Sequence, residues 1–233
     1  MPPLGYNVNP NKAGRRAIHS SSGDLIIFPK TKKGKKETVI KFFLEGNAVQ
    51  PTAFGRNRQS PPKNHAVVEQ YADLLNSKPS KTKNERIYGP PPPATYHVRP
   101  VALIRQGKNY HVIERVKGPN LHDFLRFVET KAWPKFVPDG PHLEKTKVDI
   151  SLRRQGLANL LTKQNRTLLE EWRPQRRNFM EELNEQMRYI KNAHNGMLDI
   201  YGHQMKETDF TVEGLEKGKD GKVRLKLVLV DFK

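Results

Sequence analysis

The 233-residue sequence contains no cysteine, so disulfide bonds, thiol catalysis and cysteine-ligated zinc are excluded. It also lacks any apolar run near the roughly 20 residues that a helix needs to cross a bilayer. The N-terminal stretch MPPLGYNVNPNKAGRR does not contain the apolar core of a signal peptide. These absences predict a soluble, cytoplasmic protein with no membrane partner.

Acidic residues are scarce beside basic ones, since 24 Asp and Glu stand against 42 Lys and Arg and give a net charge of +18. Hydrophobic residues make up 35% of the chain, and the mean hydropathy is −0.78, so we expect loops to take a large share. A positive excess attracts nucleic acid, anionic lipid or nucleotide, but it also serves solubility. Basic helix faces expected between Arg153 and Arg188 therefore predict either a surface for nucleic acid or an acidic protein, or ordinary solvated faces.

The N-terminal half begins with residues 1–24, which are rich in Pro, Asn, Gly and Ser and predict a flexible arm. Residues 25–29 and 37–44 predict two strands around the turn KTKKGKK. The amphipathic pattern HAVVEQYADLLN then predicts a helix over 65–76.

Two charged residues stand out within these elements. Lys41 lies inside the apolar strand pattern VIKFF, so it either points to solvent from an edge strand or is held there for a purpose. Glu69 lies within the apolar band of the helix over 65–76. A buried carboxylate needs a cationic partner, and Lys41 is the obvious one, while the alternative is an ordinary exposed helix glutamate.

The middle of the chain predicts a connector followed by a hairpin. Residues 78–96 are charged and then proline-rich, which is typical of a stiff extended connector. Residues 101–105 and 110–116 predict two strands joined across Gln-Gly-Lys-Asn. Gly118-Pro119 ends the second strand, and Asn120 predicts the N-cap of a helix.

The C-terminal part predicts two helices and a second hairpin. Leucines in a helical period predict one long helix over 149–171, and a second follows over 178–192 after the interruption at Pro174. Residues 208–215 and 223–231 predict paired strands, because the tip between them contains the turn dipeptide Asp-Gly.

Three polar residues flank this last hairpin. Asp199 lies in a short polar turn, Gln204 follows five residues later, and Asp231 ends the apolar run of the final strand. Two carboxylates and an amide from a loop and a strand end are what a site needs to hold a metal–triphosphate and orient a hydroxyl beside it. The pattern predicts phosphoryl transfer.

The order of these parts resembles the protein-kinase-like superfamily, in its atypical branch of RIO-type and aminoglycoside-phosphotransferase-type enzymes. That branch carries a catalytic Asp, a metal-binding Asn five residues later, and a metal-binding Asp that ends an apolar strand before an aromatic residue. Asp199, Gln204 and the pair Asp231-Phe232 fall on these positions. The resemblance implies ATP and Mg²⁺ as cofactors, with Gln204 and Asp231 as metal ligands and Asp199 as the residue that orients the acceptor hydroxyl.

The resemblance extends to the N-terminal half of the chain. Lys41 is similar to the kinase lysine that contacts the α- and β-phosphates, and Glu69 to the glutamate that positions this lysine. The segment from Glu114 to Val116 looks like the kinase hinge, whose backbone groups contact adenine. The resemblance therefore implies a phosphotransferase that acts on a hydroxyl of a protein or small molecule.

The implied fold class is α+β with two lobes. Residues 25–116 would form a small antiparallel sheet with one helix, and residues 117–233 a mainly helical lobe that is shortened after the metal-binding Asp. Several departures favour a non-catalytic alternative, either a pseudokinase-like scaffold or a basic nucleic-acid-binding protein. The chain has no G-x-G-x-x-G loop, Gln204 and Lys233 stand where the family has Asn and Gly, and kinases normally continue beyond this position.

Overall fold

The computed structural model describes residues 17–19, 25–29, 37–42, 65–76, 92–107, 110–131, 154–193 and 207–230. These residues form two sheets and several helices, so the α+β class predicted from the sequence is confirmed. Among the described helices, none is long and apolar enough to span a bilayer.

The chain divides into two units, and each is described by itself. Unit 1 comprises Met1–Ser60, Ala102–Arg115 and Phe136–Leu152, and unit 2 comprises Pro61–Val101, Val116–Lys135 and Arg153–Lys233. The helix over 65–76, which the sequence analysis grouped with the N-terminal lobe, belongs to unit 2.

Unit 1 contains an antiparallel five-stranded sheet in the order β1-β2-β3-β6-β5. Its strands are β1 (Ala17–His19), β2 (Leu25–Ile27), β3 (Thr38–Phe42), β5 (Leu103–Gln106) and β6 (Tyr110–Glu114). The predicted strand pair around KTKKGKK is confirmed as β2 and β3, and the predicted hairpin after residue 100 is confirmed as β5 and β6.

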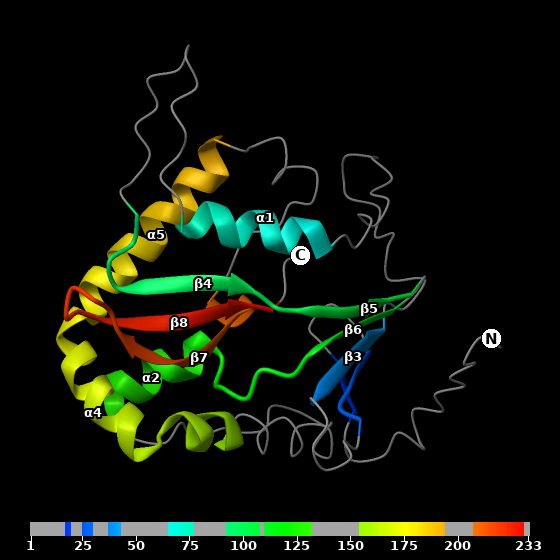
Figure 1. Cartoon of the computed structure of the whole chain (residues 1–233), viewed down its shortest axis with the longest axis horizontal. Helices are drawn as coiled ribbons and strands as arrows, with labels where there is room; N and C mark the ends of the chain where they lie inside the picture. The colour runs from blue at the N-terminus through cyan, green and yellow to red at the C-terminus, as the bar shows by residue number, and fades with distance from the viewer. Residues whose placement is uncertain are drawn as a thin grey trace, which may run out of the picture. The chain divides into compact units, whose positions relative to one another are not determined.

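Unit 2 contains a three-stranded mixed sheet in the order β4-β8-β7 (Figure 1). Its strands are β4 (Tyr96–Pro100), β7 (Phe210–Lys217) and β8 (Val223–Leu229). The central strand β8 is antiparallel to β7, which confirms the predicted C-terminal hairpin, and parallel to β4.

Strand β4 corrects the sequence analysis, which treated residues 78–96 as a connector and began the next strand at 101. Tyr96 and Val98 are buried while His97 is exposed, as in a strand with one buried face. The outer edge of β4 is satisfied by Asn76, whose Oδ1 accepts from the Val98 N–H at 2.9 Å while its Nδ2 donates to the Val98 carbonyl. The side-chain amide of Asn76, at the end of the helix over 65–76, thus takes the place of a neighbouring strand.

The helices of unit 2 are α1 (His65–Asn76), α2 (Leu121–Thr130), α4 (Lys163–Trp172) and α5 (Arg176–Ala193). The predicted helix over 65–76 is confirmed, and Pro174 lies in the predicted interruption as part of the 3-10 turn η2 (Arg173–Gln175).

The single helix predicted over 149–171 is wrong, because helical residues 154–160 end before α4 begins. Thr162 lies at the break with extended backbone, and its hydroxyl accepts from the Asn165 N–H at 3.4 Å. A threonine N-cap satisfies a free N–H at the start of the new helix.

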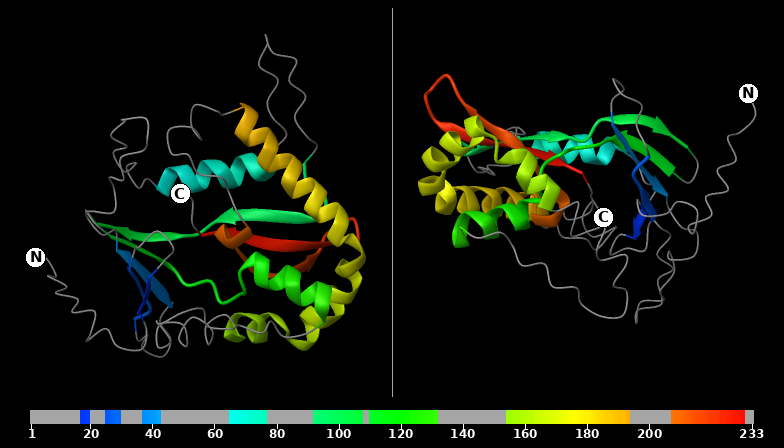
Figure 2. Two further views of the ribbon diagram at one scale, coloured as in Figure 1. Left: turned by 180° about the vertical axis from the view of Figure 1, so that it is seen from behind. Right: turned by 90° about the horizontal axis from the view of Figure 1, so that it is seen from below.

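The core of unit 2 is built on aromatic side chains. The Trp172 ring lies 5.4 Å from Phe179 and 5.5 Å from Phe124, and Tyr96 lies 5.6 Å from Phe179 between ring centroids. Burial, with a smaller contribution from the nearby Glu182 carboxylate, raises the pKa of the Tyr96 phenol. Seen from below in Figure 2, α2 and α5 lie on one side of the mixed sheet. The aromatic side chains belong to the same core as Phe210 and Leu227 of the β7–β8 hairpin, so this core fixes the hairpin.

Candidate functional site

Three of the predicted site residues, Asp199, Gln204 and Asp231, lie outside the described residues. The other four are described. Lys41 and Glu114 belong to unit 1, and Glu69 and Val116 belong to unit 2.

Lys41 lies in the interior of the five-stranded sheet. Its strand β3 pairs with β2 on one side and β6 on the other, where Lys41 is opposite Ile26 and His111. This pairing excludes the edge-strand alternative. Directly opposite residues share a face of the sheet, as do residues two apart on one strand, so Lys41 shares its face with His111 and Val39, each only 9% exposed. Lys41 is therefore a half-buried lysine on the more buried face of the sheet.

Glu69 is exposed on α1. The buried face of this helix is formed instead by Tyr71, Ala72 and Leu75. Because it is exposed, the Glu69 carboxylate needs no cationic partner to offset burial, and its role beside Lys41 stays a prediction.

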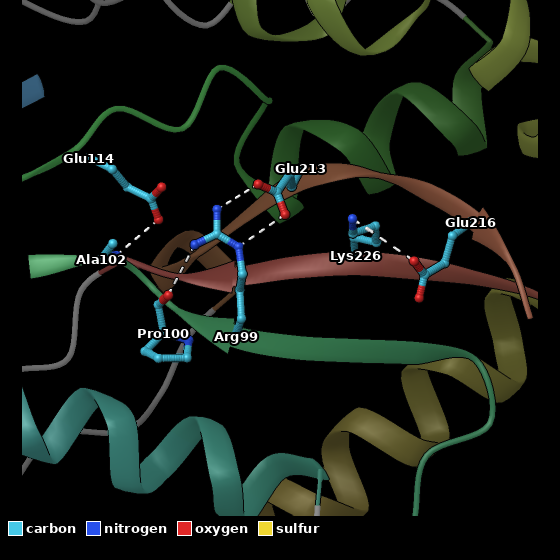
Figure 3. A network of polar contacts seen from close by, with 7 residues as sticks. All are labelled: Arg99, Pro100, Ala102, Glu114, Glu213, Glu216 and Lys226. Atoms are coloured by element: carbon cyan, nitrogen blue, oxygen red, sulfur yellow. Dashed lines mark hydrogen bonds and ion pairs between the residues drawn. The ribbon is translucent and has the colours of Figure 1, made fainter. Parts of the chain in front are cut away.

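Within unit 1, the Glu114 backbone is engaged in the sheet. Its N–H donates to the Ala102 carbonyl at 3.0 Å, and its side chain accepts from the Ala102 N–H at 2.9 Å (Figure 3). The next N–H, that of Arg115, donates to the Glu37 carbonyl at 3.0 Å, and the two side chains form an ion pair at 3.0 Å. The Glu114 N–H therefore has no capacity left for a ligand.

Val116 differs from these residues, because its backbone N–H and carbonyl have no hydrogen-bond partner within the described part of the chain. Val116 directly follows Glu114 and Arg115, whose N–H groups are bonded within unit 1, and it precedes a segment that is bonded to β7. Of the two predicted hinge contacts, Val116 is thus the one with backbone groups available.

The segment after Val116 is fixed against β7. The Val212 N–H donates to the Pro119 carbonyl at 2.8 Å, and Asn120 forms a bridge with Thr211. The approach at Gly118 is so close that a Cβ there would lie 1.6 Å from the Val212 carbonyl oxygen. Gly118 thus permits a contact that no residue with a side chain could make.

Strands β7 and β8 are held together by a backbone hydrogen bond at the open end of their hairpin, opposite the tip. The Val230 N–H donates to the Asp209 carbonyl at 2.9 Å, and the Val101 N–H donates to the Leu229 carbonyl at 3.0 Å. Just before β7, the Glu207 carboxylate lies 3.1 Å from Nδ1 of His122 on α2. These contacts fix Val230, which directly precedes Asp231 in the sequence, and Glu207, which follows Asp199 and Gln204 in the sequence.

A charged network lies on the outer face of the mixed sheet (Figure 3). Arg99 donates from Nε and Nη2 to the two carboxylate oxygens of Glu213, at 3.0 and 2.5 Å. This hydrogen bonding holds the pKa of Glu213 below its ordinary value of 4.5. Sequence reasoning missed both residues. The missed signal is the spacing of the buried residues Val212 and Leu215, which interrupts strict alternation and indicates a bulge at Glu213.

The predicted basic helix faces are neutralised only in part. Residues 154–193 contain eight Lys and Arg against five Glu, and several of these charges form ion pairs, including Arg173 with Glu170 at 3.1 Å and Arg177 with Glu181 at 2.9 Å. All described residues together carry 20 Lys and Arg against 16 Asp and Glu. The described part therefore holds a net +4 of the +18, and the larger share of the excess lies elsewhere in the chain.

In the ranges that the structure describes, no group of three or more His, Asp and Glu could hold a metal ion. Comparison with known proteins finds no matching family model, no matching curated protein and no matching solved structure.

Proposed function

We propose that this protein is an atypical kinase-like phosphotransferase that binds ATP with magnesium and transfers the γ-phosphate to a hydroxyl of a protein or small molecule. One observation carries the proposal, the 2.9 Å hydrogen bond from the Val230 N–H to the Asp209 carbonyl. Asp231 directly follows Val230, and Gln204 precedes Asp209 by five residues. Since five residues span at most about 18 Å, the chain connectivity is compatible with a shared site for the two predicted metal ligands.

The anchoring of this hairpin supports the proposal. A site for metal and phosphate must be held by elements that do not move relative to one another. The contact between His122 and Glu207 ties the start of the hairpin to α2, and the bond from Val101 to Leu229 ties its end to the chain after β4. A hairpin anchored at both of its ends would suit a catalytic loop before it and a metal-binding Asp after it.

The location of Lys41 also supports the proposal. Lys41 lies on an interior strand and is half-buried, and in the proposed role it would neutralise charge on the α- and β-phosphates of ATP. The neighbouring Val39 and His111 would limit the exposure of the lysine to water.

The remaining roles follow from the chemistry of each group. The backbone N–H and carbonyl of Val116 would bind the edge of adenine. Gln204 and Asp231 would hold magnesium through their side-chain oxygens, and Asp199 would orient the acceptor hydroxyl. Catalysis would then consist of positioning and of neutralising phosphate charge. Magnesium, when bound, would supply most of the positive charge that the transferring phosphate requires.

A thermal-shift titration with ATP and MgCl₂ tests nucleotide binding. Ligand at 100 times its Kd stabilises the native state by about 2.7 kcal/mol, and a chain of this size gains about 2–4 °C in Tm per kcal/mol. We expect a rise of about 5–11 °C. Lys41→Gln should reduce the rise, whereas Lys226→Gln, a strand lysine in the other sheet, should not. No rise in the unmodified protein would exclude the proposal, and a rise without phosphate transfer to any acceptor would favour the non-catalytic alternative.

A further inference from the structure

The segment over 116–119 is bonded to two different elements of unit 2. One is β7, whose Val212 N–H donates to the Pro119 carbonyl at 2.8 Å. The other comprises the helical residues 154–160, from which Asn159 Nδ2 donates to the Lys117 carbonyl at 3.0 Å. A strand and a helix thus each hold one carbonyl group of this segment.

The helix also approaches the same segment closely at Gly156. A Cβ at Gly156 would lie 2.7 Å from the Gly118 carbonyl oxygen and 3.0 Å from the Pro119 Cα. Both are backbone atoms, so a side chain at Gly156 would displace the segment or the helix. Glycine weakens a helix relative to alanine, and here it permits the close contact between the two backbones.

Both elements that hold segment 116–119 are anchored by buried side chains. Leu157 of the helical residues 154–160 is fully buried, and so is Val212 of β7. Asn159, in contrast, is exposed. Its amide therefore contributes the hydrogen bond to the segment and not the packing of the helix.

We propose that Gly156 and Asn159 are positioning residues for nucleotide binding, because they fix segment 116–119 and with it the backbone groups of Val116 that bind the edge of adenine. This inference rests on the proposed function. The N–H and carbonyl of Val116 have no hydrogen-bond partner within the described part of the chain, and the next residue, Lys117, is the one whose carbonyl Asn159 holds. A segment that is fixed before the ligand arrives loses little conformational freedom on binding, which raises the affinity for the base.

The test compares Asn159→Ala with the matched control Asn165→Ala. Asn165 makes the same kind of bond, since its Nδ2 donates to the Leu160 carbonyl at 2.8 Å. That bond joins α4 to the end of the preceding helical residues and does not involve segment 116–119. Alanine is the better helix former at both positions, so neither substitution weakens its helix through propensity.

Amide hydrogen exchange, measured without nucleotide, tests whether the segment is held. Exchange of the Val212 N–H should be faster in Asn159→Ala than in Asn165→Ala, because local opening of the segment breaks the bond from Val212 to Pro119. Gly156→Ala should also accelerate this exchange, because the added Cβ would displace the segment.

The second measurement compares the affinities for ATP and for inorganic tripolyphosphate, each with magnesium. Tripolyphosphate has no base, so it reports only the contacts with phosphate and metal. In Asn159→Ala the affinity for ATP should fall about 3–10-fold, as for the loss of roughly one hydrogen bond, while the affinity for tripolyphosphate stays unchanged. Asn165→Ala should bind both ligands like the unmodified protein. A general structural defect would instead lower both affinities.

Three results would overturn the inference. They are equal losses for the two ligands in Asn159→Ala, equal exchange and affinities in the two Ala variants, and equal affinity of the unmodified protein for ATP and tripolyphosphate, which would show that the base is not bound. If the unmodified protein binds neither ligand, the proposed function fails and the role in nucleotide binding fails with it. The exchange comparison then still decides whether Asn159 and Gly156 hold segment 116–119.

Discussion

Replacing Gly118 with alanine should destabilise unit 2 at the segment that follows Val116. The added Cβ would lie 1.6 Å from the carbonyl oxygen of Val212, which is a backbone atom that cannot rotate away. Ordinary contact begins at 3.4 Å, so the segment would have to move by about 1.8 Å, the difference between these two distances.

That movement would break local backbone contacts. The 2.8 Å bond from the Val212 N–H to the Pro119 carbonyl and the bridge between Asn120 and Thr211 could not both survive it. Each lost bond costs about 1 kcal/mol, and the overpacking adds about 1–3 kcal/mol. Alanine also restricts the unfolded chain more than glycine does, which offsets about 0.4–1 kcal/mol of this loss. The net loss in unfolding free energy should therefore be about 2–4 kcal/mol.

Urea denaturation followed by far-UV circular dichroism measures this loss, and the same hairpin offers a control. A Cβ at Gly214 would have no atom within 4 Å, so Gly214→Ala should leave the unfolding free energy within about 0.5 kcal/mol of the unmodified protein or raise it slightly. If Gly118→Ala were as stable as Gly214→Ala, the close approach of the segment to β7 would be refuted.

Three further predictions concern the helix cap, acid stability and polyanions. Asn120→Ala should cost about 1 kcal/mol in urea denaturation, because Asn120 Oδ1 accepts from the Asp123 N–H at 2.8 Å; no loss would refute the cap. The hydrogen bond from Arg99 lowers the pKa of Glu213 in the folded protein below its ordinary value of 4.5. The ionised Glu213 therefore stabilises the fold fully above pH 4.5, and this stabilisation is lost as the pH falls through the lower folded-state pKa. Glu213→Gln should therefore flatten the acid limb of a stability–pH curve, and an unaltered limb would contradict this. The affinity of the protein for heparin should fall steeply between about 50 and 200 mM salt, as for other polyanion complexes. Arg188→Gln should weaken this binding more than Arg177→Gln, because Arg177 already pairs with Glu181. An affinity that does not change with salt would contradict a polyanion-binding surface.

Local patterns in the sequence predicted the local elements well. The helix over 65–76 and both hairpins follow from apolar spacing and turn residues, which act within a few positions of the chain. The N-cap at Asn120 likewise follows from one residue and its neighbours.

Elements that depend on distant partners could not be predicted in this way. Strand β4 contains Pro100 and follows a proline-rich stretch, and its pairing is with β8, more than 120 residues away in the sequence. The Asn76 amide that satisfies its other edge comes from a helix end. Periodicity also extended the helix of 149–171 through Thr162, because the hydroxyl that caps the new helix gives no apolar signal.

For the candidate site, the sequence indicated the strand environment of Lys41, and the roles of its residues stay predictions. The placement of Lys41 on an apolar strand was visible from its neighbours, but its burial depended on pairing with β6. The pair of Arg99 and Glu213 could not be inferred, since it requires both the missed strand and a bulge. Asp199, Gln204 and Asp231 lie outside the described residues and stay predictions.

Calorimetric titration of Asp231→Asn with ATP and MgCl₂ tests the proposed phosphotransferase site most directly. The matched control is Asp220→Asn, because Asp220 lies at the tip of the same hairpin and forms an ion pair with Arg224 at 2.6 Å. We expect Asp231→Asn to lose magnesium-dependent binding and ATP turnover while its Tm is kept or raised, since an uncompensated charge is removed. Asp220→Asn should bind ATP with magnesium like the unmodified protein. Unchanged affinity in Asp231→Asn together with a lower Tm would identify Asp231 as a structural carboxylate and would contradict the proposed function.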